Sequence, residues 1–592
     1  MLMKKIFDLS GFEFNGNIKE TEFEGVYVSY DGKDAKIGYS TKVHKARCYF
    51  LLSMKIKNGE KQFEIKETPV FDTCGPMVGV STGGVMTVDA VKKYIDNIAA
   101  LGFNMLMLYT EDVYEMPEYP QFGYMRGRYT HDELIAIDDY AFEMGIEVIP
   151  CIQTLGHHQN YLRWPEAAKI KEARNVLLPD EEKTYEFIEC EIKTMRKCFR
   201  SNRIHLGMDE AIGLGLGKHL KIHGYEKVHD IFNRHVKRVV AIADKYNYQS
   251  MIWCDMYYTP DDPLEYYNPD AVIPQEALDS APENVDMVFW DYYHTDYDYY
   301  HKKFIQQKRF KNNETIFAGG VWTWDGHAPN FRYTYDSTKP AMEAAIDHNV
   351  KTVIATLWGG GDVDHFKALD GLCAFSEYCY KGRECTEDDV YEAATHISGQ
   401  TKEFIDAVSE YYLGYIGSVR IGTGFFYADP LFNLLNYDVD YDEAITRYTN
   451  ALNVIEKYKS HKYYTYYSSL FKVVIEKARI FKSLRKEYKA GNREYLTDFA
   501  NNTLPKLRKY YKEFYEEFKN HWLEVKKPHS LEKFSMYFGA ADYRLSYMEE
   551  IIKKHLDGSL SQIAELEEDV IGGMNLTWGT KDGYTCVMPN LS

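Results

Sequence analysis

Eight short apolar runs, most of them followed by a longer segment with helical periodicity, restrict how this chain folds more than any other feature. The runs are 77–81, 104–110, 146–154, 203–208, 250–255, 286–293, 315–322 and 352–358. Amphipathic segments lie between them at 89–101, 131–144, 183–199, 226–246 and 338–348, whereas the connection after the fifth run contains prolines and has only a weak helical pattern. Apolar strands that alternate with helices indicate a parallel sheet covered on both faces. Eight such units in about 300 residues predict a (β/α)8 barrel.

The segments before and after these runs have different patterns. Residues 1–70 contain two strand-like runs around the helical segment 40–56, which predicts a small α/β domain. Residues 71–385 form the predicted barrel domain, and residues 386–592 predict an α-helical domain, with apolar residues three and four apart. Tyrosine-rich stretches such as 463–467 suit a helical core. We expect this third domain to serve packing or a homodimer interface.

Composition limits the partners and the compartment. The 592 residues carry a formal net charge of -19, so no excess of Lys and Arg exists to neutralise nucleic-acid phosphates. The N-terminus lacks the apolar core of a signal peptide, and no run approaches the roughly 18 apolar residues of a membrane span. Ten scattered cysteines without a CxxC pair fit reduced thiols. We therefore expect a cytoplasmic protein without a nucleic-acid or membrane partner.

Acidic and aromatic residues gather directly after the predicted strands, where a (β/α)8 barrel builds its active site. Solvated turns do not need tryptophan at several successive strand ends. Aromatic rings stack on the apolar face of a sugar and carboxylates bond its hydroxyls, so this combination suits a sugar site. The residues concerned are Glu111, Asp112, His157, His158, Asp209, Glu210, Trp253, Tyr292, Tyr293, Trp322, Trp324 and Trp358.

Asp209 and Glu210 are adjacent, which is unusual for a pair of catalytic carboxylates. Most glycosidases use two carboxyl groups that flank the scissile bond. Two neighbouring residues do not usually reach that bond from opposite sides. If this pair is catalytic, its two members must divide the work in another way.

The segment HLGMDE, residues 205–210, resembles the His-x-Gly-x-Asp-Glu motif of glycoside hydrolase family 20, the β-N-acetylhexosaminidases. NMLMLYTEDVY, IPCIQTLGH, WCDMYY and TLWGGG resemble further motifs of that family, in the family's order on the matching strands. The chain resembles most the cytoplasmic-type bacterial branch with a helical C-terminal domain. The resemblance implies an exo-acting hydrolase without cofactor or metal. It would release terminal β-linked GlcNAc or GalNAc from an oligosaccharide or glycoconjugate, with retention.

The resemblance also implies a role for each catalytic candidate. In that family the nucleophile is the carbonyl oxygen of the substrate's own 2-acetamido group. Glu210 would be the general acid and later the base, and Asp209 would orient the acetamido group and stabilise the oxazolinium-like intermediate. His157 and Asp112 would form a network that tunes Glu210, with His158 as a bystander.

Substrate-binding residues follow from the same resemblance. Many family members place an arginine after the first strand, but residues 79–87 here read GVSTGGVMT. Glu111, Arg126 or Arg128 would take over its contacts with the sugar hydroxyls, or the selectivity is relaxed, which leaves the preferred epimer open. The remaining candidates are Trp253, Trp322, Trp324 and Trp358 for the hydrophobic wall, Tyr292 or Tyr293 for the acetamido carbonyl, and Asp362 or Asp364 for the O4 and O6 hydroxyls.

Three alternatives remain beside this interpretation. A retaining β-glycosidase with a protein carboxylate as nucleophile would have to use Asp325 or Asp291. A catalytically inactive sugar-binding barrel would be favoured by an altered Asp–Glu pair, but the pair is intact. A metal-dependent hydrolase is disfavoured, because no HxH follows the first strand and the later strands offer no matched ligands.

Overall fold

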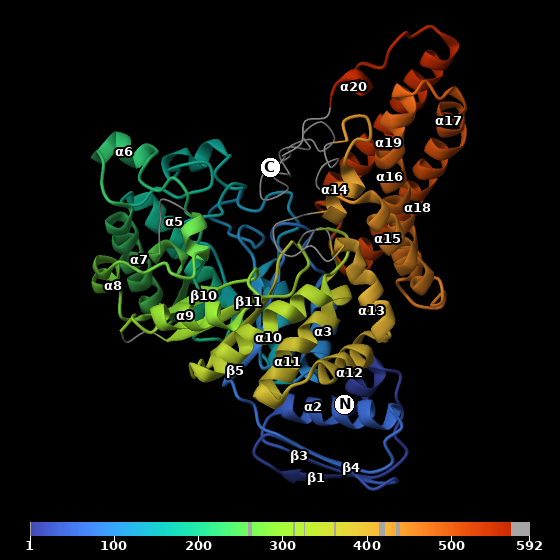
Figure 1. Ribbon diagram of the computed structural model, residues 1–592. Helices are drawn as coiled ribbons and strands as arrows, with labels where there is room; N and C mark the ends of the chain where they lie inside the picture. The colour runs from blue at the N-terminus through green and yellow to red at the C-terminus, as the bar shows by residue number, and fades with distance from the viewer. Residues whose placement is uncertain are drawn as a thin grey trace. The chain divides into compact units, whose positions relative to one another are not determined.

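The computed structural model describes residues 2–258, 263–311, 314–324, 326–359, 363–413, 421–433 and 439–569. The chain divides into two compact units (Figure 1). The first comprises Met1–Val321, Thr334–Gly360 and Ala368–Gly399, and the second comprises Trp322–Tyr333, Gly361–Lys367 and Gln400–Ser592. Within the described ranges, no helix has the length and apolar character needed to span a bilayer.

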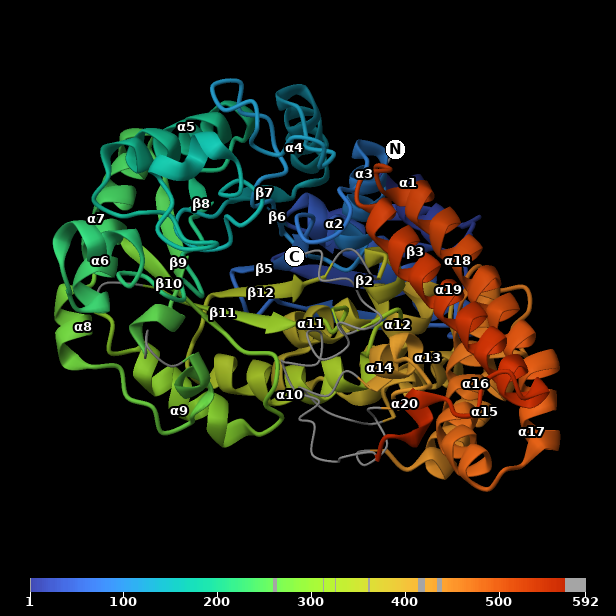
Figure 2. The ribbon, with the colours of Figure 1, turned by 90° about the horizontal axis from the view of Figure 1, so that it is seen from above.

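Eight parallel strands close into a barrel in the first unit, which confirms the predicted (β/α)8 fold (Figure 2). The ring closes where β12 pairs with β5, with Thr352 opposite Thr73. Strands such as β6 and β12 are buried on both faces, which explains why they read as continuous apolar runs. The strands are β5 (Thr73–Gly79), β6 (Met105–Tyr109), β7 (Glu147–Cys151), β8 (Arg203–His205), β9 (Gln249–Trp253), β10 (Val285–Trp290), β11 (Thr315–Gly320) and β12 (Thr352–Leu357).

Helices between the strands form the outer layer of the barrel, and α11 and α12 follow its last strand. Threonine caps start several of them: the Thr130 hydroxyl and the Glu133 carboxylate form a reciprocal capping box at α4, which Gly145 ends at a φ of 82°. In the described part of the proline-containing connection between β9 and β10, the one α-helix is the short α8, as the weak pattern suggested. These helices are α3 (Val88–Ala100), α4 (His131–Met144), α5 (Glu182–Cys198), α6 (Lys218–His223), α7 (Val228–Lys245), α8 (Gln275–Ser280), α9 (Tyr297–Gln307), α10 (Phe331–Asp347), α11 (Leu369–Lys381) and α12 (Glu387–Ser398).

A four-stranded sheet with the order β1-β3-β2-β4 lies at the N-terminus, and helix α2 covers it. The elements are α1 (Leu2–Leu9), β1 (Ile18–Glu22), β2 (Val26–Tyr30), β3 (Ala35–Tyr39), α2 (Lys42–Lys57) and β4 (Phe63–Glu67). Arg47 on α2 joins this sheet to the barrel through buried ion pairs with Glu67 at 2.5 Å and Glu377 of α11 at 3.1 Å. The small α/β fold was predicted. The division of the chain at residues 70 and 385 stays a prediction, because the two compact units do not separate this sheet from the barrel.

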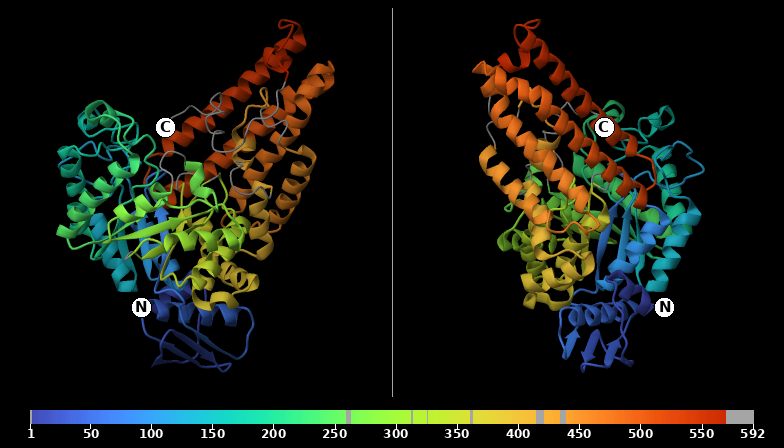
Figure 3. Two further views of the ribbon diagram at one scale, coloured as in Figure 1. Left: turned by 60° about the vertical axis from the view of Figure 1, so that its left-hand side comes forward. Right: turned by 90° about the vertical axis from the view of Figure 1, so that its right-hand side faces the viewer.

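Long antiparallel helices dominate the second unit (Figure 3). Tyr463, Tyr466 and Tyr467 of the tyrosine-rich stretch are buried in the shared apolar core of these helices. Two segments that follow barrel strands in the sequence, Trp322–Tyr333 after β11 and Gly361–Lys367 after β12, also belong to this unit. Its helices are α13 (Lys402–Ser409), α14 (Ile421–Tyr427), α15 (Tyr441–Ile455), α16 (Tyr464–Lys489), α17 (Arg493–Asp498), α18 (Leu504–Val525), α19 (Leu531–Asp557) and α20 (Ala564–Glu567).

Candidate active site

The turns after strands β6, β7 and β8 contain several residues in a left-handed backbone conformation. Glu111, His157, Met208 and Glu210 all have a positive φ, between 41° and 79°. Such backbone is costly for residues other than glycine, and it is found at functional sites where the surrounding structure enforces it. Gly207 is required here, because it has a φ of 71° and a Cβ added to it would lie 2.1 Å from the Gln153 side chain.

His157 lies between the two adjacent carboxylates. Its Nε2 is 3.0 Å from Asp209 Oδ2 and 3.6 Å from Glu210 Oε2. The side chains remain partly exposed, at 21% for His157, 15% for Asp209 and 30% for Glu210. The ends of strands β7 and β8 therefore bring three groups together that can bind or transfer protons and still meet a ligand.

Gln153, at the end of β7, holds Asp209 in place. Its Nε2 donates to Asp209 Oδ1 and to the Tyr109 hydroxyl, both over 2.8 Å, while its Oε1 accepts the Met208 N–H over 3.0 Å. One amide thus orients the carboxylate and the backbone that carries it. Gln153 lies in the predicted run 146–154, but the sequence did not identify it as a partner of Asp209.

Opposite pKa shifts distinguish the two carboxylates. Burial by itself would raise the pKa of Asp209, but the charge of His157 and its hydrogen bond outweigh burial and lower it. Burial raises the pKa of Glu210, the charge of His157 opposes the rise, and the charge of Asp209 adds to it. Burial lowers the pKa of His157, but Asp209 outweighs this effect and raises it. Near neutral pH, the arrangement favours an ionised Asp209 and a cationic His157, and it shifts Glu210 toward its protonated form.

Asp112 has a different partner from the one expected. Arg126 Nε donates to Asp112 Oδ1 over 2.9 Å, and Arg126 Nη2 donates to the Ser81 carbonyl at the end of strand β5. In the part of the chain that the structure describes, His157 bonds Asp209 and has no hydrogen bond with Asp112. The Asp112–His157 contact of the expected network is thus replaced by an Arg126–Asp112 ion pair, because Arg126 reaches a buried carboxylate that would otherwise be uncompensated.

Glu111 is a buried carboxyl with one unpartnered oxygen. It is 3% exposed, and the Tyr109 hydroxyl donates to its Oε1 over 3.4 Å. Its Oε2 is buried without a hydrogen-bond partner among the described residues. Burial raises the pKa of Glu111 to about 7. A buried acceptor or donor without a partner is costly, so this oxygen is well suited to bonding a ligand.

Aromatic rings from several strand ends surround Trp358. Its ring centroid lies 4.8 Å from Tyr109, 6.1 Å from Trp253 and 6.4 Å from Tyr292. Tyr292 also stacks on Trp290 at 5.3 Å, whereas Tyr293 packs against Tyr267. The predicted residues Trp253, Tyr292 and Trp358 thus form one cluster, and the electrostatic influence of Asp209 on the Tyr292 hydroxyl places the cluster near the carboxylates.

Three of the predicted residues belong to the second unit, and two lie outside the described residues. The rings of Trp322 and Trp324 pack against each other with their centroids 4.3 Å apart, and both residues belong to the second unit. Asp364 belongs to that unit too and pairs with Lys367 at 3.4 Å. Asp362 and Asp325 lie outside the described residues. His158 is buried against Phe187, and burial lowers its pKa to about 3.

Two residues near Glu210 were missed as site residues. The Asp255 carboxylate accepts the Glu210 N–H over 3.0 Å. Tyr267 packs against Trp290 at 5.8 Å, and the charge of Glu210 contributes to a raised pKa of Tyr267, after burial and Tyr293. Asp255 is the last residue of the fifth run, directly after Trp253 and Cys254, so its position at a strand end could have identified it. Tyr267 lies in the proline-containing connection, where no sequence pattern indicates a role.

His157, Asp209 and Glu210 are also spaced so that they could hold a metal ion, the one such group in the described ranges. A metal would have to take the His157 nitrogen and the Asp209 oxygen that already bond each other. One nitrogen and two oxygens do not select a particular metal. The hydrogen-bonded network accounts for these side chains without an ion.

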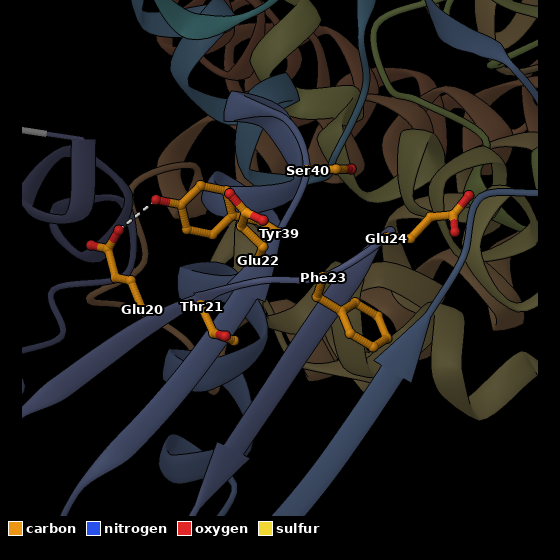
Figure 4. A pocket seen from close by; sticks show the side chains of 7 residues that line it. All are labelled: Glu20, Thr21, Glu22, Phe23, Glu24, Tyr39 and Ser40. Atoms are coloured by element: carbon orange, nitrogen blue, oxygen red, sulfur yellow. Dashed lines mark hydrogen bonds between the residues drawn. The ribbon is translucent and has the colours of Figure 1, made fainter.

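A separate hollow of about 900 Å³ lies on the N-terminal sheet (Figure 4). Glu20 in it already bonds Tyr39 and forms an ion pair with Lys45 at 2.7 Å. Its lining contains no histidine and no group of converging buried side chains, so the barrel end is the better candidate site. The lining residues are Glu20, Thr21, Glu22, Phe23, Glu24, Tyr39 and Ser40.

Comparison with known families gives two matches along the chain. Residues 83–360 match the family described as "Glycosyl hydrolase family 20, catalytic domain". Residues 424–576 match the "Glycoside Hydrolase 20C C-terminal domain". The first match covers most of the barrel, including the ends of strands β6 to β10 and β12 that bring the candidate site together.

The individual proteins to which the chain is similar share only about a quarter of their aligned residues with it. The chain is 24% identical over 235 residues to hexosaminidase D from Bos taurus, which is 39% of this chain and 64% of that protein. It is 26% identical over 183 residues to a beta-hexosaminidase from Vibrio furnissii, 25% of this chain and 30% of that protein. The chain thus spans less than two thirds of either relative.

Two solved structures share the fold. A chitobiase from Flavobacterium johnsoniae aligns with a TM-score of 0.52 and 16% identity over 96% of this chain and 89% of that one. An exo β-N-acetylglucosaminidase from Vibrio harveyi, solved with N-acetylglucosamine, aligns with a TM-score of 0.50 and 14% identity over 69% of this chain and 72% of that one. At these identities the likeness concerns the fold.

Proposed function

The chain belongs to glycoside hydrolase family 20, and we propose that it is an exo-acting β-N-acetylhexosaminidase that works by substrate-assisted catalysis. Its substrate would be an oligosaccharide or glycoconjugate that ends in β-linked N-acetylhexosamine. The names of the relatives support this activity for them. For this chain, support comes from the carboxylates at the end of strand β8.

The distance between Asp209 and Glu210 carries the proposal. One oxygen of each, together with His157 Nε2, lies within 4.8 Å of the others. Carboxyl groups are roughly 5–5.5 Å apart in retaining glycosidases with a protein nucleophile and roughly 6.5–9.5 Å apart in inverting ones. Asp209 and Glu210 are also adjacent residues after one strand, so they do not readily flank a glycosidic bond from opposite sides, but they suit two groups that serve neighbouring atoms of one sugar.

In the proposed reaction, the acetamido carbonyl oxygen forms a bond to the anomeric carbon while the glycosidic C–O bond breaks. Glu210 gives its proton to the departing oxygen, and ionised Asp209 stabilises the positive charge that develops on the acetamido group. Glu210, now a carboxylate, takes a proton from water as the water oxygen bonds to the anomeric carbon and the oxazolinium ring opens. The opposite pKa shifts of the two groups match these two roles.

The main alternative needs a free carboxylate elsewhere at the barrel end. Asp291 is buried, and both its oxygens already accept hydrogen bonds. The donors are the backbone of Tyr293 and His294 and the hydroxyls of Tyr299 and Tyr300. An attack by Asp291 would break these bonds. This favours the substrate's own acetamido group as nucleophile.

Three p-nitrophenyl substrates test the proposal: the β-N-acetylglucosaminide, the β-N-acetylgalactosaminide and the plain β-glucoside. We expect turnover of one or both acetamido sugars and none of the glucoside, since only the former carry the internal nucleophile. An oxazoline-type inhibitor with an acetamido-like ring should inhibit. Comparable turnover of the glucoside would instead indicate a protein nucleophile, and no turnover of any substrate would favour a sugar-binding barrel.

We further propose that Arg126 and Glu111 bind the hydroxyls of the non-reducing sugar. Arg126 is 8% exposed and reaches the end of strand β5, where many family members place an arginine of their own. Its Nη1 has no partner among the described residues, and Glu111 Oε2 is equally unpartnered. A charged donor and a buried carboxyl would together discriminate hydroxyl positions.

Arg126→Lys should lower kcat/KM about 10- to 100-fold, because a hydrogen bond to a charged group is worth about 1.5–3 kcal/mol and lysine lacks the second arm. Lysine keeps the positive charge beside Asp112, so folding should be preserved. Arg128→Lys is the matched control, since Arg128 bonds carbonyls of its own loop at Pro120 and Phe122. Equal kinetics for the Arg126→Lys variant and the wild type would show that Arg126 only stabilises the loop.

A further inference from the structure

Asp255 connects the fifth strand to the backbone of the candidate acid. One of its oxygens, Oδ2, accepts the Glu210 N–H over 3.0 Å, and the other, Oδ1, lies 3.5 Å from Trp290 Nε1. The residue is 9% exposed. Trp290 is in turn fixed by the Tyr266 hydroxyl, which donates to its carbonyl over 2.6 Å.

Glu210 needs such support, because its φ of 47° is a conformation that a residue with a side chain rarely adopts unaided. The turn is held on its C-terminal side by the Ile212 N–H, which donates to the Glu210 carbonyl over 2.7 Å. On its N-terminal side, the Glu210 N–H has Asp255 as its acceptor. Without Asp255 that donor would lose its partner in a largely buried place.

From this geometry, we infer that Asp255 is a positioning residue that fixes the direction of the Glu210 side chain by holding its backbone in the left-handed turn. The inference rests on the proposed function of Glu210 as the acid. Asp255 touches no reacting atom, and it acts through Glu210 alone.

The charge of Asp255 does not conflict with this role. Its carboxyl faces Asp209 and Glu210, with Cys254 and Tyr266 as the other titratable neighbours. Burial, assisted by the negative charge of Asp209, raises the pKa of Asp255 to about 8. The carboxyl is therefore mostly protonated at neutral pH, and it can accept the Glu210 N–H without adding another negative charge beside Asp209.

Asp255→Ala and Asp255→Asn test the inference in the full-length protein. The alanine variant loses the acceptor, so kcat should fall roughly 10- to 100-fold through misplacement of the acid. The affinity for the product N-acetylhexosamine should change less than about threefold, since the sugar-binding groups remain. Asparagine keeps an acceptor oxygen, so Asp255→Asn should restore kcat to within about threefold of the wild type.

Asp370→Ala is the matched control. Asp370 on α11 is a 3% exposed carboxyl, and burial raises its pKa to about 7. Among the described residues it accepts the Gly371 N–H and has no hydrogen bond with Glu210. It should keep kcat within about threefold. Hydrogen exchange gives a readout that does not depend on activity: the Glu210 amide should exchange at least about tenfold faster in Asp255→Ala than in the wild type or Asp370→Ala.

The outcomes separate this inference from the proposed function. If the wild type cleaves no acetamido sugar, the proposed function fails, while the exchange of the Glu210 amide still decides whether Asp255 holds it. An active wild type with unchanged kcat in Asp255→Ala overturns the inference alone. If the alanine variant does not fold, Asp255→Asn decides: a folded but inactive Asp255→Asn also overturns it.

Discussion

Replacing Glu210 with glutamine is expected to reduce kcat/KM for the acetamido sugars by about 10²–10⁴-fold, because the amide cannot supply the proton that the leaving oxygen needs. Glutamine has nearly the same shape, and the Glu210 N–H keeps its bond to Asp255. Steady-state kinetics on the wild type and the variant measure the loss. The affinity for product should stay within about threefold.

The leaving group provides the internal control for this prediction. p-Nitrophenolate leaves without much help, whereas a methylphenol or a second sugar needs full protonation. The loss in Glu210→Gln should therefore lie near the lower end of that range for the nitrophenyl substrate and near the upper end for the poorer leaving groups. Equal losses for all leaving groups would contradict a role in proton donation.

The pH dependence of wild-type activity follows from the pKa values of Glu210 and Asp209. The acid must be protonated, so activity falls as the pH rises through the pKa of Glu210, which burial places above its ordinary value of 4.5. Asp209 must be ionised, so activity falls again only as the pH drops through its pKa, which His157 holds below the ordinary 3.8. We expect a bell-shaped kcat/KM profile whose basic limb disappears in Glu210→Gln.

The barrel was predictable because its strands are buried on both faces and therefore read as continuous apolar runs. Strands β1 and β3 were not among the two strand-like runs predicted before residue 70. Strand β1, IKETE, was missed for the opposite reason, because it is a partly exposed edge strand with no fully buried residue. Strand β8 proved shorter than its run, since Gly207 and Met208 take positive φ values and leave the extended conformation. Patterns of burial predict a strand, but the turn that ends it depends on contacts with Gln153 from the neighbouring strand end.

The candidate site was predictable where strand order alone decides proximity. His157 and Asp209 follow adjacent strands, so their closeness needed no further information. The partner of Asp112 could not be predicted, because it depends on the path of the loop that follows. A bridge between Tyr114 and Tyr129 closes this loop and brings Arg126 to Asp112. Tyr267 was hidden in a connection without a regular pattern. Long loops carry functional side chains, and sequence periodicity does not describe their course.

Asp209→Asn should lower kcat by about 10²–10³-fold, because asparagine keeps the shape but removes the charge that stabilises the oxazolinium-like intermediate. Its hydrogen bond from Gln153 can persist, so the fold should not change. The charge matters mainly after the acetamido oxygen has attacked. KM should consequently change far less than kcat, and steady-state kinetics with the p-nitrophenyl acetamido sugars would measure both.

Two inhibitors separate this role from simple substrate binding. A cationic mimic of the oxazolinium ring should bind Asp209→Asn about 10²–10³-fold more weakly than the wild type, in parallel with kcat, whereas neutral N-acetylglucosamine should lose less than about tenfold. Arg126→Lys should weaken both ligands to a similar extent, since its contacts are with hydroxyls present in both of them. If Asp209→Asn weakened both ligands equally, Asp209 would contribute uniform binding, and the stabilising charge would have to come from another group.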